Sequence, residues 1–438
     1  MNTAAVVRQV SHALAEAKEL YRESNTESYA QHVAASRALP GGNTRTVIFV
    51  DPFPITLTEG KDAQVKSLDG RWYRDFLGEY TAGFYGHSNP HLRAAAMAAL
   101  DRGWSMGGHT EAEAEMAFLL QERFPSMELL RFANSGTEAN LYAISTAMAY
   151  TGKKKIVVFE GAYHGGVFVF SGASRHPLTA PFDFIVAPYN DIEGTTALLA
   201  QHANEIAAVI VEPMQGSGGC IPASLEFLQH LREWTALHGT VLIFDEVMTS
   251  RLSYGGMQAV HTITPDMTTL GKYLGGGFSF GAFGGRSEIM NVFNPLRPNA
   301  IGHAGTFNNN IFTMTAGAAG LKHVLTKSLI EEVNGRGEKL RRQLNELVSG
   351  SSLPMTFTGR GSMMNVHMTR ANVRSVRDLK DNIVPLRDLF YYDMVREGFW
   401  IAKRGMINVS IPTTDADCEA LLQAVSHFVE SRADLVLS

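Results

Sequence analysis

The middle of the chain alternates short apolar runs with stretches of helical periodicity. Residues 207–211 (AAVIV) have the length and composition of one buried strand, and residues 225–231 (LEFLQHL) place apolar side chains at helical spacing. Gly239 ends that helix, and the apolar run 241–244 (VLIF) predicts the next strand. The alternation extends from about residue 68 to 290, and it predicts an α/β domain built on a mostly parallel sheet.

The segments on either side have a different pattern. Residues 1–35 are typical of one or two polar helices, and residues 40–66 are irregular and strand-like. After about residue 325 the pattern predicts a helix over 329–348, a strand pair near 355–368, a helix near 386–397 and a last helix from 415. We therefore divide the chain into an N-terminal segment (1–67), a large domain (68–325) and a small α+β domain at the C-terminus (326–438).

Composition restricts the class of protein. The 438 residues are 45% hydrophobic and 18% charged, which is typical of a globular domain, and the net charge of −5 gives no basic field for nucleic acid or an anionic membrane. No apolar run approaches the roughly 18 residues of a membrane span. The two cysteines are far apart in sequence and match no zinc-binding pattern, so we expect the protein to lie in a reducing compartment, the cytoplasm. The histidines form no metal-binding motif, so we expect no catalytic metal.

One candidate binding motif lies where a helix begins. Ser135, Gly136 and Thr137 precede the predicted helix 139–150, and Ser135 with Glu138 fits a capping box. The same arrangement provides free backbone N–H groups, hydroxyls and the positive end of the helix dipole, which suit a phosphate. A plain helix cap and a phosphate cup are compatible interpretations of this motif.

Two ionisable residues follow predicted strands. Asp245 comes directly after the run 241–244, and a carboxylate at a buried strand end needs a partner, which we expect to be cationic. Lys272 lies between apolar residues and a triple glycine, and burial there would make its amine nucleophilic. An ordinary solvated turn remains the alternative for each. Tyr163 lies beside glycines in a third turn and could stack on a flat cofactor, although such an aromatic residue is more often structural.

A phosphate cup, an acid, a lysine and a stacking aromatic residue are together the requirements of pyridoxal 5′-phosphate (PLP). At this point the chain resembles the class-III aminotransferases, which are PLP enzymes of fold type I. The resemblance covers about residues 40–415. Its motifs are NSGTEAN (134–140), GAYHGG (161–166), VEP (211–213), FDEVMTS (244–250), LGKYLGGG (270–277) and GTFNNN (305–310).

The resemblance implies a role for each site residue. Lys272 is the lysine that binds the cofactor and moves the substrate proton, and Asp245 binds the pyridine nitrogen. The cup at residues 135–137 holds the phosphate, while Tyr163 and Met248 cover the two faces of the ring. Thr306 reaches the phosphate of the other subunit of a homodimer with shared active sites. The implied fold is a large domain with a mostly parallel seven-stranded sheet, plus a small domain and active-site lid built from both termini.

Two branches of the family compete. Residues 39–42 (LPGG) resemble glutamate-1-semialdehyde aminomutase, but the aminomutase pattern GT-x-x-x-NP is broken by Ile311 in place of its proline. Residues 43–45 (NTR), 305–310 and 403–405 (KRG) are similar instead to β-amino-acid aminotransferases, among them the β-phenylalanine aminotransferases. An aminomutase or racemase of the same fold stays open as an alternative. A nicotinamide oxidoreductase is disfavoured because the chain has no GxGxxG motif. A non-catalytic binding protein is disfavoured because the lysine, the aspartate and the phosphate cup are all intact.

Two arginines favour transamination. A transaminase seats the carboxylates of an amino acid and of a keto acid in one site, and a guanidinium binds a carboxylate through two hydrogen bonds. The resemblance places Arg45 and Arg404 at the substrate pocket, and their apolar neighbours suggest that both point inward. A surface arginine in an ion pair is the alternative for each. The sequence therefore predicts transfer of an amino group from a β-amino acid, expected to be aromatic, to 2-oxoglutarate or a similar keto acid in a ping-pong cycle.

Overall fold

The structure is a computed structural model that describes residues 3–171 and 176–435. The chain forms two compact units. We call the first the terminal unit, because it consists of Met1–Ser88, Gly335–Asn372 and Leu379–Ser438. The second, the central unit, consists of Asn89–Asn334 and Val373–Asp378. The terminal unit thus joins segments from both ends of the chain.

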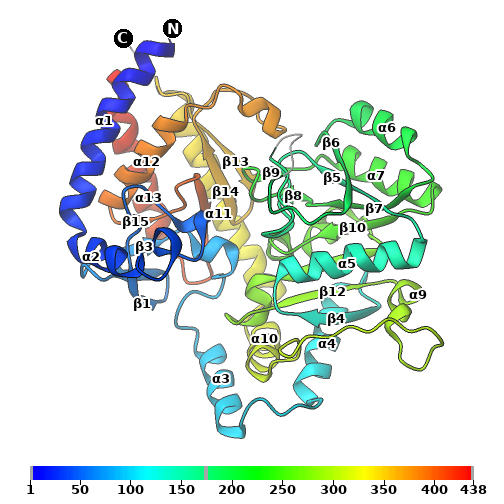
Figure 1. Cartoon of the computed structure of the whole chain (residues 1–438). Coiled ribbons are helices and arrows are strands. Elements are labelled where there is room, and N and C mark those ends of the chain that lie inside the picture. Colours follow the sequence, from blue (N-terminus) through cyan, green and yellow to red (C-terminus); the bar gives the residue numbers. More distant parts are fainter. Residues whose placement is uncertain (1–2, 172–175, 436–438) are drawn as a thin grey trace. The chain divides into compact units, whose positions relative to one another are not determined.

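A seven-stranded sheet organises the central unit (Figure 1). Its order is β4 (Leu129–Ala133), β12 (Gly281–Gly285), β11 (Met267–Gly271), β10 (Val241–Asp245), β7 (Ile206–Val211), β5 (Lys155–Phe159) and β6 (Asp183–Ala187). Among the described strands of this sheet, β12 alone pairs antiparallel with its neighbours, and the other strand pairs are parallel. The prediction of a mostly parallel sheet in an α/β fold is confirmed.

Helices and apolar side chains bury this sheet. All six residues of β7 are fully buried, as its unbroken apolar sequence predicts. Phe227, Leu228 and Leu231 on α7 belong to the same core cluster as the strands. The helices of the unit are α3 (Pro90–Arg102), α4 (Glu111–Arg123), α5 (Gly136–Thr151), α6 (Ile192–Gln201), α7 (Leu225–Leu237), α8 (Gly256–His261), α9 (Ser287–Met290) and α10 (Ile311–His323). A two-stranded ribbon, β8 (Met214–Gln215) with β9 (Ile221–Pro222), follows β7.

The terminal unit combines two small sheets with helices. One sheet has the order β1 (Leu57–Lys61), β2 (Gln64–Ser67), β3 (Trp72–Asp75) and β15 (Phe399–Trp400), and the other β13 (Thr356–Arg360), β14 (Met363–His367) and β16 (Met406–Asn408). The helices are α1 (Thr3–Ser24), α2 (Thr26–Ala35), α12 (Val384–Arg396) and α13 (Asp415–Ser431). Helix α11 (Lys327–Ser349) begins in the central unit and ends in the terminal one.

The elements that the pattern of the sequence predicts one by one are present in the structure. The predicted helices over 225–231 and 329–348 correspond to α7 and α11, and the strand pair near 355–368 corresponds to β13 and β14. Helix α5 ends at Gly152, which has the left-handed φ of 71° that suits a glycine cap. The terminal unit continues past residue 67 to Ser88, because β3 pairs with β2 and with β15. No helix within the described ranges is long and apolar enough to cross a membrane.

Candidate active site

Three turns meet at one edge of the central sheet. Asp245 is the last residue of β10 and pairs with Thr269 of the parallel strand β11, so the turns that follow both strands leave the same edge. Gly281 pairs with Gly271 on one side and with Ala133 on the other. The turn after β4 therefore starts level with the end of β11. Open α/β sheets bind ligands at this edge.

The turn after β4 opens helix α5. Ser135 is the N-cap, and its hydroxyl accepts a hydrogen bond from the Glu138 N–H at 3.1 Å. The Glu138 carboxylate completes the cap one residue earlier than expected, because it accepts from the backbone N–H of Asn134 at 2.9 Å and not from that of Ser135. The N–H groups of Gly136 and Thr137 lie in the first turn, where helical N–H groups have no partner within the helix. An anion fits this position.

Glycines allow the turns at this edge to approach one another closely. A Cβ atom on Gly136 would lie 2.8 Å from Val247, two residues after Asp245. A Cβ atom on Gly271 would lie 3.2 Å from Val247 and 3.4 Å from the amide nitrogen of Gly136. A Cβ atom on Gly281 would lie only 2.1 Å from the carbonyl oxygen of Ser135. The sequence at these positions thus lets the cup, the acid and the lysine turn approach one another.

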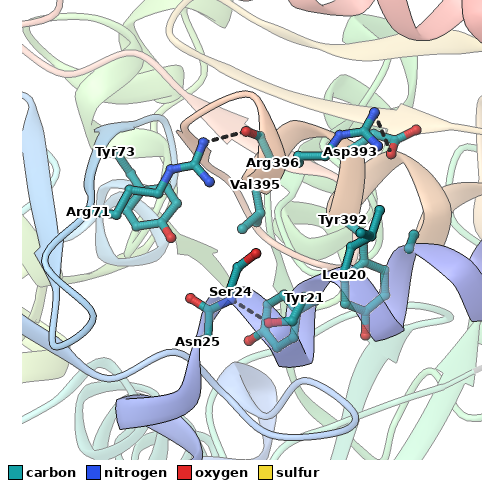
Figure 2. Close-up of a pocket in the computed structure, with 11 residues that line it drawn as sticks. Leu20, Tyr21, Ser24, Asn25, Arg71, Tyr73, Tyr392, Asp393, Val395 and Arg396 are labelled. Atoms are coloured by element: carbon teal, nitrogen blue, oxygen red, sulfur yellow. Dashed lines mark hydrogen bonds and ion pairs between the residues drawn. The ribbon is translucent and has the colours of Figure 1, made fainter.

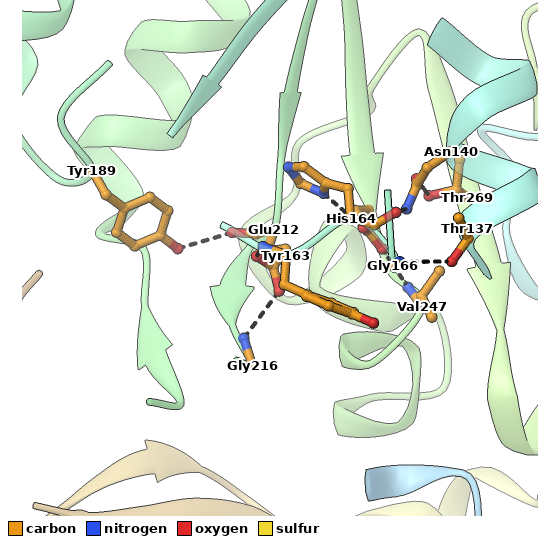
Figure 3. A network of polar contacts seen from close by, with 11 residues as sticks. Thr137, Asn140, Tyr163, His164, Gly166, Tyr189, Glu212, Gly216, Val247 and Thr269 are labelled. Carbon is orange, nitrogen blue, oxygen red and sulfur yellow. Dashed lines mark hydrogen bonds and ion pairs between the residues drawn. The ribbon is translucent and has the colours of Figure 1, made fainter. Parts of the chain in front are cut away.

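Asp245 lies at the centre of a buried polar network (Figure 3). Its Oδ2 accepts hydrogen bonds from Asn140 Nδ2 and from His164 Nδ1, both at 2.8 Å, and its Oδ1 accepts from the Val247 N–H at 3.0 Å. Asn140 is fixed in turn because its Oδ1 accepts from the Thr269 hydroxyl at 2.6 Å. The ionisable side chain that pairs with Asp245 is thus the imidazole of His164.

A second buried carboxylate holds the turn that carries Tyr163. Glu212 Oε2 accepts from the Tyr163 N–H and Oε1 from the Gly216 N–H, each at 3.0 Å, and the Tyr189 hydroxyl donates to the Glu212 carbonyl at 2.8 Å (Figure 3). Burial raises the pKa of Glu212 to about 7; the charge of His164 opposes this rise and Asp245 adds to it.

The two residues expected to cover the ring connect to Glu212. Tyr163 is 41% exposed, so its ring is not part of the core. On the other side of Glu212, a Cβ atom on Gly216 would lie 2.2 Å from Met248 Sδ. The missing side chain of Gly216 therefore makes room for the half-buried Met248. One carboxylate thus fixes the backbone of Tyr163 and of the residue against which Met248 packs.

Lys272 follows β11 directly and adopts a left-handed backbone conformation. Its φ is 56°, which is uncommon outside glycine and is found preferentially at functional sites. The side chain is partly buried, next to the fully buried Tyr273 and Leu274. The structure therefore places Lys272, Asp245, the cup at residues 135–137, Tyr163 and Met248 in one unit and around one sheet edge.

The two candidate substrate arginines belong to the terminal unit and lie close to Tyr80. Arg45 forms an ion pair with Glu79, and Arg404 Cζ lies 4.8 Å from the centroid of the Tyr80 ring. Burial raises the pKa of Tyr80, and Arg404 and Arg45 both oppose this rise. The turn that carries Tyr80 is strained, because Glu79, Tyr80 and Thr81 have φ values of 47°, 52° and 78°.

The side chain of Arg45 is more exposed than the sequence predicts. We inferred from its apolar neighbours that the side chain points inward, but 45% of it is exposed. Val47 and Ile48 are themselves 45% and 39% exposed, so these apolar neighbours do not mark a buried segment. Arg404 is partly buried, as expected from Ile401 and Met406.

Thr306 lies on an exposed surface of the central unit. It lines a hollow of about 560 Å³ together with Trp104, Met106 and Phe307. These three large apolar side chains are 58%, 54% and 58% exposed. An exposed apolar cluster of this kind is typical of an interaction surface. Among the described residues, no group of His, Cys, Asp and Glu side chains could hold a metal ion.

Comparison with known proteins agrees with this geometry. A profile of the class-III aminotransferase family matches residues 49–429. The chain belongs to the class-III aminotransferases. It is 47% identical to a β-phenylalanine transaminase of Variovorax paradoxus over 98% of both chains, and 35% identical to a glutamate-1-semialdehyde 2,1-aminomutase of Bacillus licheniformis over 93% of this chain and 98% of the relative.

Solved structures give the same assignment. The β-phenylalanine aminotransferase of V. paradoxus superposes with a TM-score of 0.96 at 47% identity, covering 98% of this chain and 99% of the other. A transaminase solved with PLP bound superposes with a TM-score of 0.86 at 30% identity, covering 94% and 99%. This class-III aminotransferase is thus a PLP-dependent enzyme of fold type I.

The residues at the sheet edge fit this cofactor. The cup provides N–H donors for a phosphate, and Asp245 is a buried carboxylate that can face a protonated pyridine nitrogen. The Nε2 atom of His164 is buried and has no hydrogen-bond partner in the described part of the chain, so Asp245 is held by an imidazole with one nitrogen still to satisfy. Both observations suit a site completed by a polar ligand.

Several residues of this network were not predicted as site residues. His164, Asn140 and Glu212 all lie inside the motifs that carry the family resemblance, but we assigned none of them a role. Each is a polar side chain that is at least 95% buried, and its partner is distant in sequence: 81 residues separate His164 from Asp245, and 105 separate Asn140 from Asp245. A polar residue at a buried position of a helix or turn is the signal that could have identified them.

Proposed function

We propose that this aminotransferase moves the amino group of a β-amino acid, preferably an aromatic one such as β-phenylalanine, to 2-oxoglutarate or a similar keto acid in a ping-pong cycle. The observation that carries the proposal is a pair of guanidinium groups near Tyr80: Arg404 Cζ lies 4.8 Å from the centroid of its ring, and Arg45 pairs with the adjacent Glu79. Two carboxylate anchors suit an enzyme that binds an amino acid and then a dicarboxylic keto acid. The 47% identity to a β-phenylalanine transaminase supports the choice of donor.

In this proposal the sheet edge of the central unit performs the chemistry. PLP, when bound, supplies an aldehyde that condenses with amines and a ring that accepts electrons. The N–H groups at Gly136 and Thr137 bind its phosphate, and Asp245 holds the proton on its ring nitrogen. Tyr163 and Met248 exclude water from the two faces of the ring.

Lys272 is the proposed proton carrier. Its side-chain amine would hold the cofactor in the resting enzyme. With a substrate bound, Lys272 Nζ would act as the general base that takes the proton from the amine-bearing carbon and as the general acid that gives it back. Arg45 and Arg404 bind the carboxylates of the donor and the acceptor, and the structure is compatible with either assignment of the two roles.

We further propose a homodimer in which Thr306 completes the cofactor site of the partner subunit. The exposed cluster of Trp104, Met106 and Phe307 beside Thr306 supports an apolar interface at this surface. A second copy of the chain would bury this cluster and place Thr306 at the boundary between subunits. The dimer is therefore part of the proposed active site.

Two half-reactions test the proposal. The purified holoenzyme is mixed with 3-amino-3-phenylpropanoate and, separately, with glutamate-1-semialdehyde, and the absorbance of the bound cofactor is followed. We expect the first compound to bleach the band and 2-oxoglutarate to restore it. A response to the semialdehyde alone, with product formed in the absence of any keto acid, would instead assign an aminomutase, the alternative that the 35% identity to that enzyme keeps open.

A further inference from the structure

The terminal unit contains a cavity of about 110 Å³ that none of the proposed catalytic residues lines (Figure 2). It lies between helix α1, the turn that leads into β3 and the last turns of α12. Leu20, Tyr21 and Ser24 line it from α1, Arg71 and Tyr73 from the turn and β3, and Val395 from α12. Figure 2 shows these side chains arranged around the space.

Arg71 brings a positive charge to this wall without a counter-charge. Its Nη2 donates to the backbone carbonyl of Arg396 at the end of α12, and its Cζ lies 5.3 Å from the centroid of the Tyr73 ring. In the ranges that the structure describes, Arg71 forms no ion pair with any carboxylate. Its Nε and Nη1 atoms are therefore available to an anion.

The carboxylates near Arg71 are already engaged. Among the described residues, Asp393 is the one acidic residue lining the cavity, and it accepts from Arg432 Nε at 2.9 Å and Nη2 at 3.1 Å, with Arg396 Nη2 at 3.4 Å. Asp69 raises the pKa of Tyr73 and so lies nearby, but its carboxylate accepts from the Glu27 N–H and from the Ser28 hydroxyl. Asp69 and Asp393 are thus both engaged by other groups and leave the Arg71 guanidinium without a carboxylate partner among the described residues.

The remaining wall suits an apolar body. The rings of Tyr21 and Tyr73 are buried, and Leu20 and Val395 add aliphatic surface. Tyr21 stays neutral, because burial raises its pKa and its hydroxyl donates to the Phe53 carbonyl at 2.8 Å. At about 110 Å³ the cavity is smaller than the roughly 150 Å³ space that holds a benzene molecule, so a ring would fill it and extend into its open side.

We propose that this cavity is a binding site for a small organic carboxylate. The apolar body of the ligand lies among Tyr21, Tyr73 and Val395, its carboxylate binds the free edge of the Arg71 guanidinium, and the Ser24 hydroxyl donates a further hydrogen bond. The exposed Arg71 and Arg396 mark the open side, so the charged end of the ligand stays close to water. This site is independent of the proposed transaminase reaction.

The test uses the holoenzyme and 4-bromobenzoate, with the neutral 4-bromobenzamide as matched probe. Crystals soaked in the acid should show an anomalous bromine peak between Tyr21 and Tyr73, and calorimetric titration should give a dissociation constant at least tenfold lower than for the amide. Two variants test the site independently: Arg71→Gln removes the charge, and Ser24→Trp fills the cavity while leaving the contact between Arg71 and α12 in place. Each should weaken binding of the acid at this site at least tenfold. Transaminase activity should stay at the wild-type level in both.

Arg22→Gln is the matched control, because Arg22 lies on the same helix, pairs with Glu19 and does not line the cavity. It should leave binding unchanged. The proposal would be overturned by the absence of a bromine peak in the cavity, by equal affinity for acid and amide, or by wild-type affinity in both Arg71→Gln and Ser24→Trp. A peak in soaked crystals without binding in solution would show binding at crystal concentration only and would also reject the site.

Discussion

Single residues show how the enzyme keeps charges inside the central unit. Asp245 is 3% exposed, yet its two oxygens receive three hydrogen bonds, from an amide, an imidazole and a backbone N–H. Such donors compensate the loss of hydration that makes a buried carboxylate costly. Asn140 and His164, both distant in sequence, and the nearby Val247 N–H thus satisfy Asp245 together.

Asp245→Asn tests the role of the acid. An amide has nearly the same shape but cannot hold a proton on the ring nitrogen of the cofactor, so we expect the rate of the first half-reaction to fall by about 100-fold or more. The folded state should persist, since most of the network remains. Single-turnover absorbance measures the rate and thermal unfolding measures stability. An unchanged rate combined with a large loss of stability would assign Asp245 a purely structural role.

The raised pKa of Glu212 predicts that the stability of the enzyme depends on pH. Its pKa rises from 4.5 to about 7 on folding, so between these pH values the folded enzyme keeps a proton that the unfolded chain releases. The free energy of unfolding should therefore fall as the pH rises from 4.5 to 7, by on the order of 3 kcal/mol in total from this group. Glu212→Gln cannot ionise and should lack this contribution.

Chemical denaturation of the wild type and of Glu212→Gln across pH 4.5–7.5 measures the effect as a difference between the two proteins. We expect the stability of the wild type relative to the variant to decrease over this range. The exposed Glu346 provides the control, since Glu346→Gln should track the wild type at every pH. A constant difference between Glu212→Gln and the wild type would contradict a raised pKa at Glu212.

At the scale of elements, periodicity and cap residues were sufficient to predict the strands and helices with the clearest local pattern. The apolar run at 241–244 and the glycine at 239 placed β10 and the end of α7 because both depend on local sequence. The contacts of Glu212 with Tyr163 and Gly216, and of Asn140 with Thr269, depend on how distant turns meet, so no local pattern contained them. The exposure of the Arg45 side chain likewise depends on tertiary packing, so its apolar sequence neighbours did not predict it.

Strand β12 supports the cup through Gly281. A Cβ atom at this position would lie 2.1 Å from the Ser135 carbonyl oxygen, so Gly281→Ala must push the cup away from the sheet. We expect the dissociation constant for PLP to rise at least about tenfold, which corresponds to roughly 1.4 kcal/mol. Titration of the apoenzyme with PLP measures it.

The control is a glycine with open space around it. A Cβ atom on Gly335 in α11 would meet no described atom within 4 Å, so Gly335→Ala should leave PLP affinity unchanged and should stabilise the helix by roughly 0.5–1 kcal/mol. If Gly281→Ala bound PLP as tightly as the wild type, β12 would not be a support of the cup.

For the whole molecule, the proposed dimer makes a prediction about assembly. Trp104→Ser combined with Phe307→Ser removes two large side chains from the exposed cluster beside Thr306. We expect this variant to shift from dimer to monomer in light scattering and to lose PLP more readily, because each site would lack the partner subunit. Leu237→Ser removes a side chain that is 81% exposed at the end of α7 and should leave both properties unchanged. A double variant that stays dimeric would place the interface elsewhere.

The central claim is that an amino group passes from a β-amino acid to a keto acid. The most direct measurement is to incubate the holoenzyme with ¹⁵N-labelled 3-amino-3-phenylpropanoate and 2-oxoglutarate and to follow the label by mass spectrometry. We predict ¹⁵N-glutamate in an amount equal to the donor consumed, and none with Lys272→Ala. Consumption, racemisation or isomerisation of the donor without labelled glutamate, at the same rate in the absence of any keto acid, would contradict the account.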